Sequence, residues 1–444
     1  MIRTTTETFA AHCRGIPLEH LPKTFQDAIV VVKSIGFRYL WIDSLCIIRD
    51  DAEDWRREAA RMGSVYSNAV ITIAATGARD RREGLFLKRP DSDEPVEIPF
   101  KGSTIQCSLH PHPEYGNVDN SPLDKRVWIT QEWLLSKRMV HYTQARMIWS
   151  CATLSKGEDG ERVYSLEAEN LRGFLADSQD VGIAQSTAGF HYDRASVVRS
   201  YCSRSLTYPT DKPVAIQGPA ERLSCRQPET YAHGLWFARE STDFVSSQLL
   251  WFCKPPRMGH GVKGVKTAAE GLSRPEALRY IPSWSWQSTI GHIAFHEPAH
   301  SANTMLRNVH LNGSTMQMEA ILIPLCETWG PVLVDTPLNE RWPFSSHFSS
   351  AAFASGAATL PHGLYLLGQS FERKGWVSFD QYDIPDGDTV CCVVSSNSST
   401  NGSLDGVNVL LLQLSGGHYA RVGFGELLID SVTLDNSRVS ICVI

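Results

Sequence analysis

Two carboxylates near the start of the chain have the residue type and placement for acid–base chemistry. Asp43 directly follows the short apolar run YLWI, and Glu58 lies three residues after Trp55 on the flank of a predicted amphipathic helix. A partly buried carboxylate has a raised pKa, so it can act as an acid, a base or a stabiliser of positive charge. Asp43 can equally cap the next segment of chain. Glu58 can equally pair with Arg61 or Arg126.

Glu132 is a third acidic candidate. It directly follows Gln131 in the segment WITQEW. A neighbouring amide and carboxylate can bind the hydroxyls of a ribose, and they can also hold a turn by hydrogen bonding to the backbone. The sequence leaves both roles open for this pair.

Helices and strands are predicted to alternate through residues 21–86. Apolar residues at helical spacing indicate a helix over residues 21–35, with Gly36 as its stop signal. Residues 39–42 and 70–75 are short apolar runs typical of buried strands. Between them, Asp50 or Asp51 can cap a second helix. One face of that helix has four large or apolar members: Trp55, Ala59, Met62 and Tyr66.

The predicted order of a strand, a helix and a second strand indicates where a ligand would bind. Two strands joined by one helix are predicted to be parallel with a right-handed crossover, as in an open α/β sheet. Ligands of such sheets bind outside the carboxyl ends of the strands. A site is therefore expected near Asp43, Ser44 and the loop of residues 77–84.

Several blocks of sequence also resemble one known family. They are RYLWIDSLCIIRDDAEDW, REAARMGSVYSNAVITIAA, GLF and PLDKRVWITQEWLLSKRMVHYT, which fall in order within residues 4–151. These blocks are similar to the fungal heterokaryon incompatibility (HET) domain. YCSRSLTYPTDKPVAIQG, YAHGLWF and IPSWSW, within residues 201–286, are similar to the region that follows this domain in long members.

The resemblance implies both a fold and a role. The HET domain has been likened to the TIR domain, which has a flavodoxin-like parallel sheet, and some TIR domains cleave NAD with a glutamate. It implies NAD as a possible substrate, no resident cofactor, and Ser44, Gln131 and Trp128 as candidate binding residues. The catalytic candidates remain Glu58, Asp43 and Glu132. The implied role is non-self recognition, in which the domain triggers programmed cell death.

Two other functions stay open. One is a non-catalytic signalling module that self-associates or binds a protein partner, and the other is an enzyme of secondary metabolism on the same scaffold. Family members usually begin with a strand of the type Y-x-x-L-S-Y-x-W-G, and no such strand occurs here. The expectation is either a truncated N-terminus or a smaller sheet with unpaired strand edges.

Composition excludes several classes of protein. The net charge of −6 over 444 residues gives no electrostatic signature of nucleic-acid binding. No apolar run is long enough to cross a bilayer, and residues 1–20 have no signal-peptide core. Eleven dispersed cysteines without a C-x-x-C pair are typical of reduced thiols, so a cytoplasmic location is expected.

Three regions are predicted along the chain. Residues 1–151 are the HET-like α/β domain, and residues 152–290 are a mixed region in which four tryptophans form an aromatic core. Residues 291–444 are a β-rich domain with turns at Asn-Gly and Gly-Gly pairs. The tryptophans are Trp236, Trp251, Trp284 and Trp286.

Two further sequence patterns match known motifs but lack the secondary structure that those motifs require. GHGVKG at residues 259–264 matches G-x-G-x-x-G but lacks a preceding buried strand that leads into a helix, so it is interpreted as a loop. His292, His296 and His300 have helical spacing, yet residues 291–295 are predicted to be a strand, on which the three side chains do not converge. His110 and His112 lie in a predicted loop, so no metal site is expected.

Overall fold

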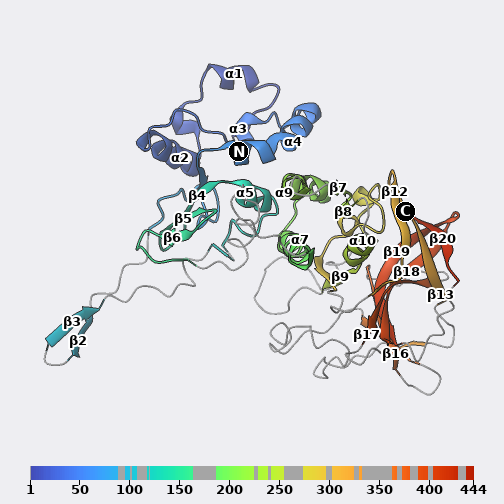
Figure 1. Cartoon of the computed structure of the whole chain (residues 1–444). Coiled ribbons are helices and arrows are strands. Elements are labelled where there is room, and N and C mark those ends of the chain that lie inside the picture. Colours follow the sequence, from blue (N-terminus) through green and yellow to red (C-terminus); the bar gives the residue numbers. More distant parts are fainter. Residues whose placement is uncertain are drawn as a thin grey trace. The chain divides into compact units, whose positions relative to one another are not determined.

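The computed structural model divides the chain into two compact units, coloured by sequence in Figure 1. The N-terminal unit comprises Met1–Leu206 and Val214–Arg222, and the C-terminal unit comprises Thr207–Pro213 and Leu223–Ile444. The structure describes the following residues: 2–88, 96–100, 103–107, 118–119, 121–163, 187–224, 229–238, 242–254, 274–296, 303–324, 330–332, 363–367, 373–380, 389–398, 404–428 and 437–444. The predicted domain boundaries at residues 151 and 290 stay a prediction.

Two helices of the N-terminal unit, α2 (Lys23–Ser34) and α4 (Ala52–Asn68), confirm the predicted helices. The unit also contains the α-helices α1 (Phe9–Arg14), α3 (Asp43–Cys46), α5 (Ile129–Leu135) and α7 (Thr187–Cys202). A 3-10 helix, η1 (Leu18–His20), precedes α2. Gly36 ends the α2 region with a φ of 82°, a value that glycine adopts without strain. Asp51 caps α4, because its side chain accepts hydrogen bonds from the amides of Glu53 and Asp54.

A four-stranded mixed sheet lies at the centre of this unit. Its strands β1 (Thr72–Ala74), β4 (Arg138–Tyr142), β5 (Met147–Cys151) and β6 (Ser155–Gly157) pair in that order. Only the β1–β4 pair is parallel, while the other two pairs are antiparallel. The fold is therefore α/β with a parallel element, and a flavodoxin-like parallel sheet stays an expectation.

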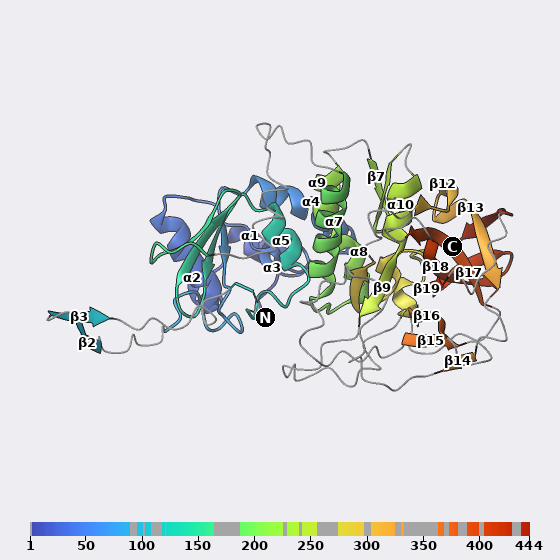
Figure 2. The same cartoon turned by 60° about the horizontal axis from the view of Figure 1, so that its bottom comes forward.

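Helices pack on both faces of the β1–β4 pair. On one face, Ala28 and Val31 of α2 cluster with Tyr142 of β4. On the other face, Trp133 of α5 clusters with Met139 of β4, and Figure 2 shows both helices beside these strands. Period-2 alternation of side chains along each strand produces the two faces.

The predicted strand at residues 39–42 is wrong. These residues belong to no strand, and Tyr39 is 90% exposed. The expected parallel crossover to β1 is therefore absent in this part of the chain. The physical reason is that a strand requires a hydrogen-bonded neighbour, and a cavity separates this segment from β1.

Residues 96–107 lie outside this sheet. They form an antiparallel hairpin of β2 (Val96–Phe100) and β3 (Ser103–Cys107). In the next part of the chain, η3 (Pro209–Asp211), α8 (Lys212–Ala215) and α9 (Gln217–Ser224) follow α7.

The first part of the C-terminal unit has the predicted aromatic core. Two antiparallel pairs, β7 (Glu229–Ala232) with β8 (Leu235–Ala238) and β9 (Trp251–Lys254) with β10 (His292–Phe295), accompany α10 (Thr242–Leu249). The 3-10 helices η5 (Glu276–Leu278) and η6 (Trp286–Ser288) lie between β9 and β10. All four predicted core tryptophans are buried. The Trp286 indole donates to the Gly234 carbonyl over 2.8 Å, and a Cβ at Gly234 would lie 2.7 Å from that indole nitrogen.

The rest of this unit is β-rich, as predicted. Its strands are β11 (Asn303–Thr304), β12 (Arg307–Asn312), β13 (Thr315–Pro324), β14 (Gly330–Val332), β15 (Gly363–Leu367), β16 (Arg373–Phe379), β17 (Thr389–Ser398), β18 (Leu404–Ser415), β19 (His418–Leu428) and β20 (Val439–Val443). Gly313 and the pair Gly416–Gly417 have positive φ in the turns before β13 and β19. The predicted turn at residues 401–402 lies outside the described residues.

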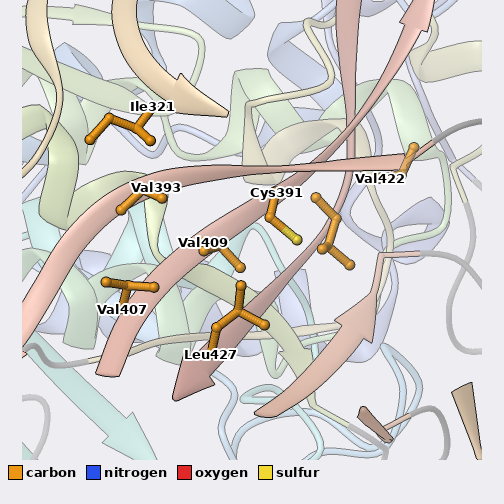
Figure 3. Packing of buried hydrophobic residues seen from close by; sticks show 8 residues of the cluster. Ile321, Cys391, Val393, Val407, Val409, Val422 and Leu427 are labelled. Carbon is orange, nitrogen blue, oxygen red and sulfur yellow. The ribbon is translucent and has the colours of Figure 1, made fainter. Parts of the chain in front are cut away.

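Five of these strands form a closed ring. The pairings run β17–β13–β20–β19–β18 and return to β17, and a single parallel residue pair, Tyr419 with Val443, joins β19 to β20. Figure 3 shows the apolar cluster that this ring contributes, including Val393, Val409 and Leu427, each fully buried. Ser395 and Ser396 are buried in β17 and pair with β18.

Two excluded motifs fall partly or wholly outside the described residues. Residues 259–264, His110, His112 and His300 cannot be placed. His292 and His296 lie at and just beyond β10, as expected for a strand. Of the residues that the structure describes, none form a group of three or more side chains suited to a metal ion. Among the described helices, none combines the length and apolarity that a bilayer span requires.

Candidate functional site

A cavity of about 540 Å³ lies in the N-terminal unit between the extended segment of residues 37–42 and β1. Residues of α2 and the last turns of α4 complete its walls. Most lining side chains are apolar, including Phe25, Val32 and Ile73. Asp43 and Glu132 supply its carboxylates, so two of the three predicted acidic candidates meet at one cavity.

The cavity follows from how the chain pairs locally. β1 forms hydrogen bonds to β4 on one side and is the terminal strand of its sheet on the other. In the described part of the chain, no backbone hydrogen bond joins residues 38–41 to β1. The backbones of β1 and of residues 38–41 therefore line a common space without backbone hydrogen bonds between them.

Asp43 is the first residue of α3, at the mouth of this space. Its carboxylate accepts a hydrogen bond from the Arg49 guanidinium over 2.6 Å, and its side chain is 42% exposed. The capping interpretation is not what the structure shows, because Ile42 is the N-cap residue of α3. A carboxylate at this position can stabilise positive charge on a ligand.

Glu132 lies in the first turn of α5, and its surroundings alter its acidity. Burial raises the pKa of this carboxyl above its ordinary value, and the negative charge of Asp43 raises it further. Arg126 and a hydrogen bond from the Tyr66 hydroxyl act in the opposite direction. A carboxyl with a raised pKa beside an ionised carboxylate is a common arrangement for acid–base pairs.

Tyr66 is a component of the site that the sequence did not identify. Burial raises the pKa of its hydroxyl well above the ordinary value, with the charges of Glu132 and Asp43 as the next causes. Its ring meets Trp41 edge to face, with 5.8 Å between the centroids. The helical pattern placed Tyr66 on the buried face of α4, but no local signal predicted that the hydroxyl would meet Glu132.

Glu58 lies outside the lining of the cavity. Its carboxylate accepts hydrogen bonds from Arg61 over 3.1 Å and from Arg57 over 3.4 Å. The predicted pairing with Arg61 is therefore confirmed, whereas Arg126 acts on Glu132. Whether Glu58 or the other carboxylates take part in catalysis stays a prediction.

The three predicted binding residues occupy different environments. Ser44 is buried, and within the described residues its hydroxyl has no hydrogen-bond partner. Gln131 is buried. Its side-chain amide donates a hydrogen bond to the Ala215 carbonyl over 3.2 Å and accepts one from the Gly63 amide over 3.0 Å, so it joins two backbone segments. Trp128 is the N-cap residue of α5. None of the three lines the cavity.

The predicted loop of residues 77–84 also lies outside the cavity lining. It folds back on α2, where the Thr24 hydroxyl donates to the Arg81 carbonyl over 2.9 Å. Just beyond it, the Leu85 amide donates to the buried Asp27 carboxylate over 2.9 Å. Gly84 has a φ of 83°, and a Cβ there would lie 2.3 Å from that carboxylate. The loop therefore fixes α2 rather than facing the carboxylates.

Comparison with protein-family models identifies the family of the segment that contains this cavity. Residues 3–132 match the family model for the heterokaryon incompatibility protein (HET). This segment is a HET domain. It contains Asp43, Tyr66, Arg126 and Glu132 together, so the acidic cavity belongs to the HET domain. Neither the curated proteins nor the solved structures gave a match to the chain.

Proposed function

We propose that this chain acts in heterokaryon incompatibility, as an effector whose HET domain triggers cell death. The family match supports this role. The observation that supports a chemical mechanism is the meeting of Asp43, Glu132 and Tyr66 at one cavity, with the pKa of Glu132 raised. The site of action is the cytoplasm in this proposal.

The reaction that suits these groups is hydrolysis of the bond between nicotinamide and ribose in NAD. As that bond breaks, its electron pair leaves with nicotinamide, and positive charge develops on the ribose. The Asp43 carboxylate would stabilise this charge, as carboxylates do in glycoside hydrolysis. A water molecule would then add to the ribose, and ionised Glu132 would accept its proton.

A second candidate is a non-catalytic module that binds a protein partner. Two observations favour it: the cavity is lined mostly by apolar side chains, and the described residues of its lining include no lysine or arginine. NAD carries two phosphates, for which proteins usually supply backbone amides at helix starts or several cations. A protein ligand needs neither.

The test compares two glutamate variants of the whole chain in a filamentous fungus. Glu132→Gln removes the carboxyl at the cavity, and Glu58→Gln is a matched control on an ion pair outside the lining. Cellular NAD and cell survival are measured after induced expression. The enzyme mechanism predicts that NAD falls more than tenfold with the wild type and with Glu58→Gln, but not with Glu132→Gln.

The other outcomes separate the two candidates. Cell death with unchanged NAD would contradict the enzyme mechanism and support the binding module. Survival with unchanged NAD for the wild-type chain would contradict the proposed effector role itself. Protein levels of all three chains are compared, so that loss of folding is not mistaken for loss of function.

A further inference from the structure

The cavity lies beside the terminal strand β1, on the side where a further strand of the sheet would pair. β1 is the terminal strand of its sheet, and residues 38–41 have no backbone hydrogen bonds to it among the described residues. In a parallel pair, part of the backbone N–H and C=O groups of a strand point to the side away from its partner. On this side of β1 such groups face the cavity rather than another strand.

The rim of the cavity is unusually apolar for an exposed surface. Phe37 is 41% exposed, Tyr39 is 90% exposed and Val70 is 54% exposed, and all three belong to the lining. Ile35, at the end of α2, is 45% exposed and lines it too. Exposed apolar side chains gathered around one opening mark an interaction site more often than isolated ones do.

We propose that this cavity binds an extended segment of another protein, which enters as an additional strand beside β1. The backbone of that segment would pair with the free edge of β1 and with residues 38–41. Its side chains would be apolar at alternate positions, to contact α2 and the apolar wall. A side chain that donates a hydrogen bond, such as serine, threonine or tyrosine, would face Glu132.

The unpaired backbone groups favour a polypeptide over other apolar ligands. A lipid chain would fill the space but leave the N–H and C=O groups without partners, and each buried polar group without a partner is costly. An extended peptide supplies donors and acceptors at the spacing of a strand. β1 has three residues, which span about 10 Å, and residues 38–41 would span about 13 Å in a strand, so a peptide of three to four residues would cover both.

This inference does not depend on the proposed cell-death role. Strand binding is measured on the purified chain without NAD and without a cell. If the chain proves to be an enzyme, an inserted strand would cover Glu132 and Asp43 and so exclude substrate. If it is a signalling module, the strand is its ligand.

The test uses three fluorescent seven-residue peptides and the full-length protein. The peptides carry threonine at alternate positions and, between them, valine, leucine or tyrosine. Each has a matched partner that is N-methylated at alternate amides, which keeps the side chains but removes donors on one edge. Binding is measured by fluorescence anisotropy, and circular dichroism confirms that each protein variant is folded.

The protein variants form a matched pair. Val70→Arg places a charge at the rim, whereas Val30→Arg alters a valine of equal exposure, 54%, that lies on α2 outside the lining. The expected result is that at least one peptide binds to the wild type and to Val30→Arg. Val70→Arg and N-methylation should each weaken binding at least tenfold.

Three results would overturn the proposal. These are failure of all three peptides to bind, equal binding of an N-methylated partner, and equal loss of binding in both valine variants. The second result would indicate an apolar pocket for small molecules or lipid instead of a strand site.

Discussion

The two units differ in how the edges of their strands are paired. In the C-terminal unit, β17, β13, β20, β19 and β18 pair around a ring, and the side chains of the ring form a fully buried apolar cluster. In the N-terminal unit, β1 ends the sheet beside a cavity rimmed with exposed apolar side chains. Pairing around a ring covers most of the strand edges, whereas an open sheet leaves an edge at which a ligand can bind. The comparison associates stability with the C-terminal unit and ligand binding with the N-terminal unit.

The largest effect is expected from the buried ion pair of the C-terminal unit. Arg421 is fully buried, donates to Asp380 over 2.9 Å and to the Leu249 carbonyl over 2.6 Å, and lies 3.5 Å from the centre of the Trp251 ring. Arg421→Ala leaves the Asp380 carboxylate buried without this partner. The expected loss in the free energy of unfolding is about 3–5 kcal/mol.

The measurement for this pair is urea unfolding followed by tryptophan fluorescence. The control is Arg279→Ala in the same unit, where an exposed guanidinium lies 3.7 Å from Glu276. This control is expected to change stability by less than about 1 kcal/mol. If both variants were equally stable, the C-terminal unit would not depend on its buried contacts as the comparison requires.

Acid is expected to weaken the C-terminal unit through His296. Burial lowers the pKa of this imidazole to about 4 from its ordinary 6.5. The folded state therefore binds fewer protons than the unfolded chain between these two values, and stability falls as the pH drops through them. The full loss is on the order of 3 kcal/mol. Urea unfolding at pH 7 and pH 4.5 should show a smaller difference for His296→Gln, and an equal difference would refute this source of acid sensitivity.

The same substitution, valine to alanine, is expected to change stability by different amounts in the two units. Val409 is fully buried in the ring, and Val70 is 54% exposed at the rim of the cavity. Val409→Ala should cost about 2 kcal/mol, because it removes buried surface and leaves a void, whereas Val70→Ala should cost less than about 0.5 kcal/mol. Thermal unfolding of the two variants beside the wild type measures both. Equal losses would mean that the cavity rim is part of a packed core.

A small pH-dependent effect is expected at Glu132. Because its folded-state pKa is raised, the folded state binds more protons than the unfolded chain in the range just above the ordinary pKa, and stability rises as the pH falls through that range. The side chain is partly exposed, which limits the effect to less than about 1 kcal/mol. Glu132→Gln should flatten this dependence in urea unfolding from pH 7 to pH 5, while Glu58→Gln should keep it.

The sequence predicted much of the fold because the relevant signals are local. The apolar spacing and the Asp51 cap predicted α4, and the Gly416–Gly417 turn predicted the β18–β19 hairpin. Residues 39–42 have the composition of a strand, yet composition cannot show whether a neighbouring strand is present to pair with them. The ring of strands could not be predicted from local sequence patterns either, because β13 and β20 pair across more than a hundred residues of sequence.

The candidate site could be predicted only in part for the same reason. Asp43 and Glu132 were singled out by their places after a strand-like run and within WITQEW, and the fold brings both to the cavity. Glu58 was chosen from helical spacing alone, which cannot tell whether a carboxylate on the flank of a helix meets a cavity or two arginines. Tyr66 joins the site through a contact between helices α4 and α5, for which the sequence holds no local signal.

Amide hydrogen exchange of the whole chain tests the comparison most directly. The account predicts that the amides of residues 38–41 and of the free edge of β1 exchange at least a hundredfold faster than those of β17, β18 and β19, and that they slow when a strand-forming peptide is added. The residues of the ring should not respond to the peptide. Slow exchange at β1 and residues 38–41 in the free protein, equal to that of the ring, would contradict the existence of an open edge.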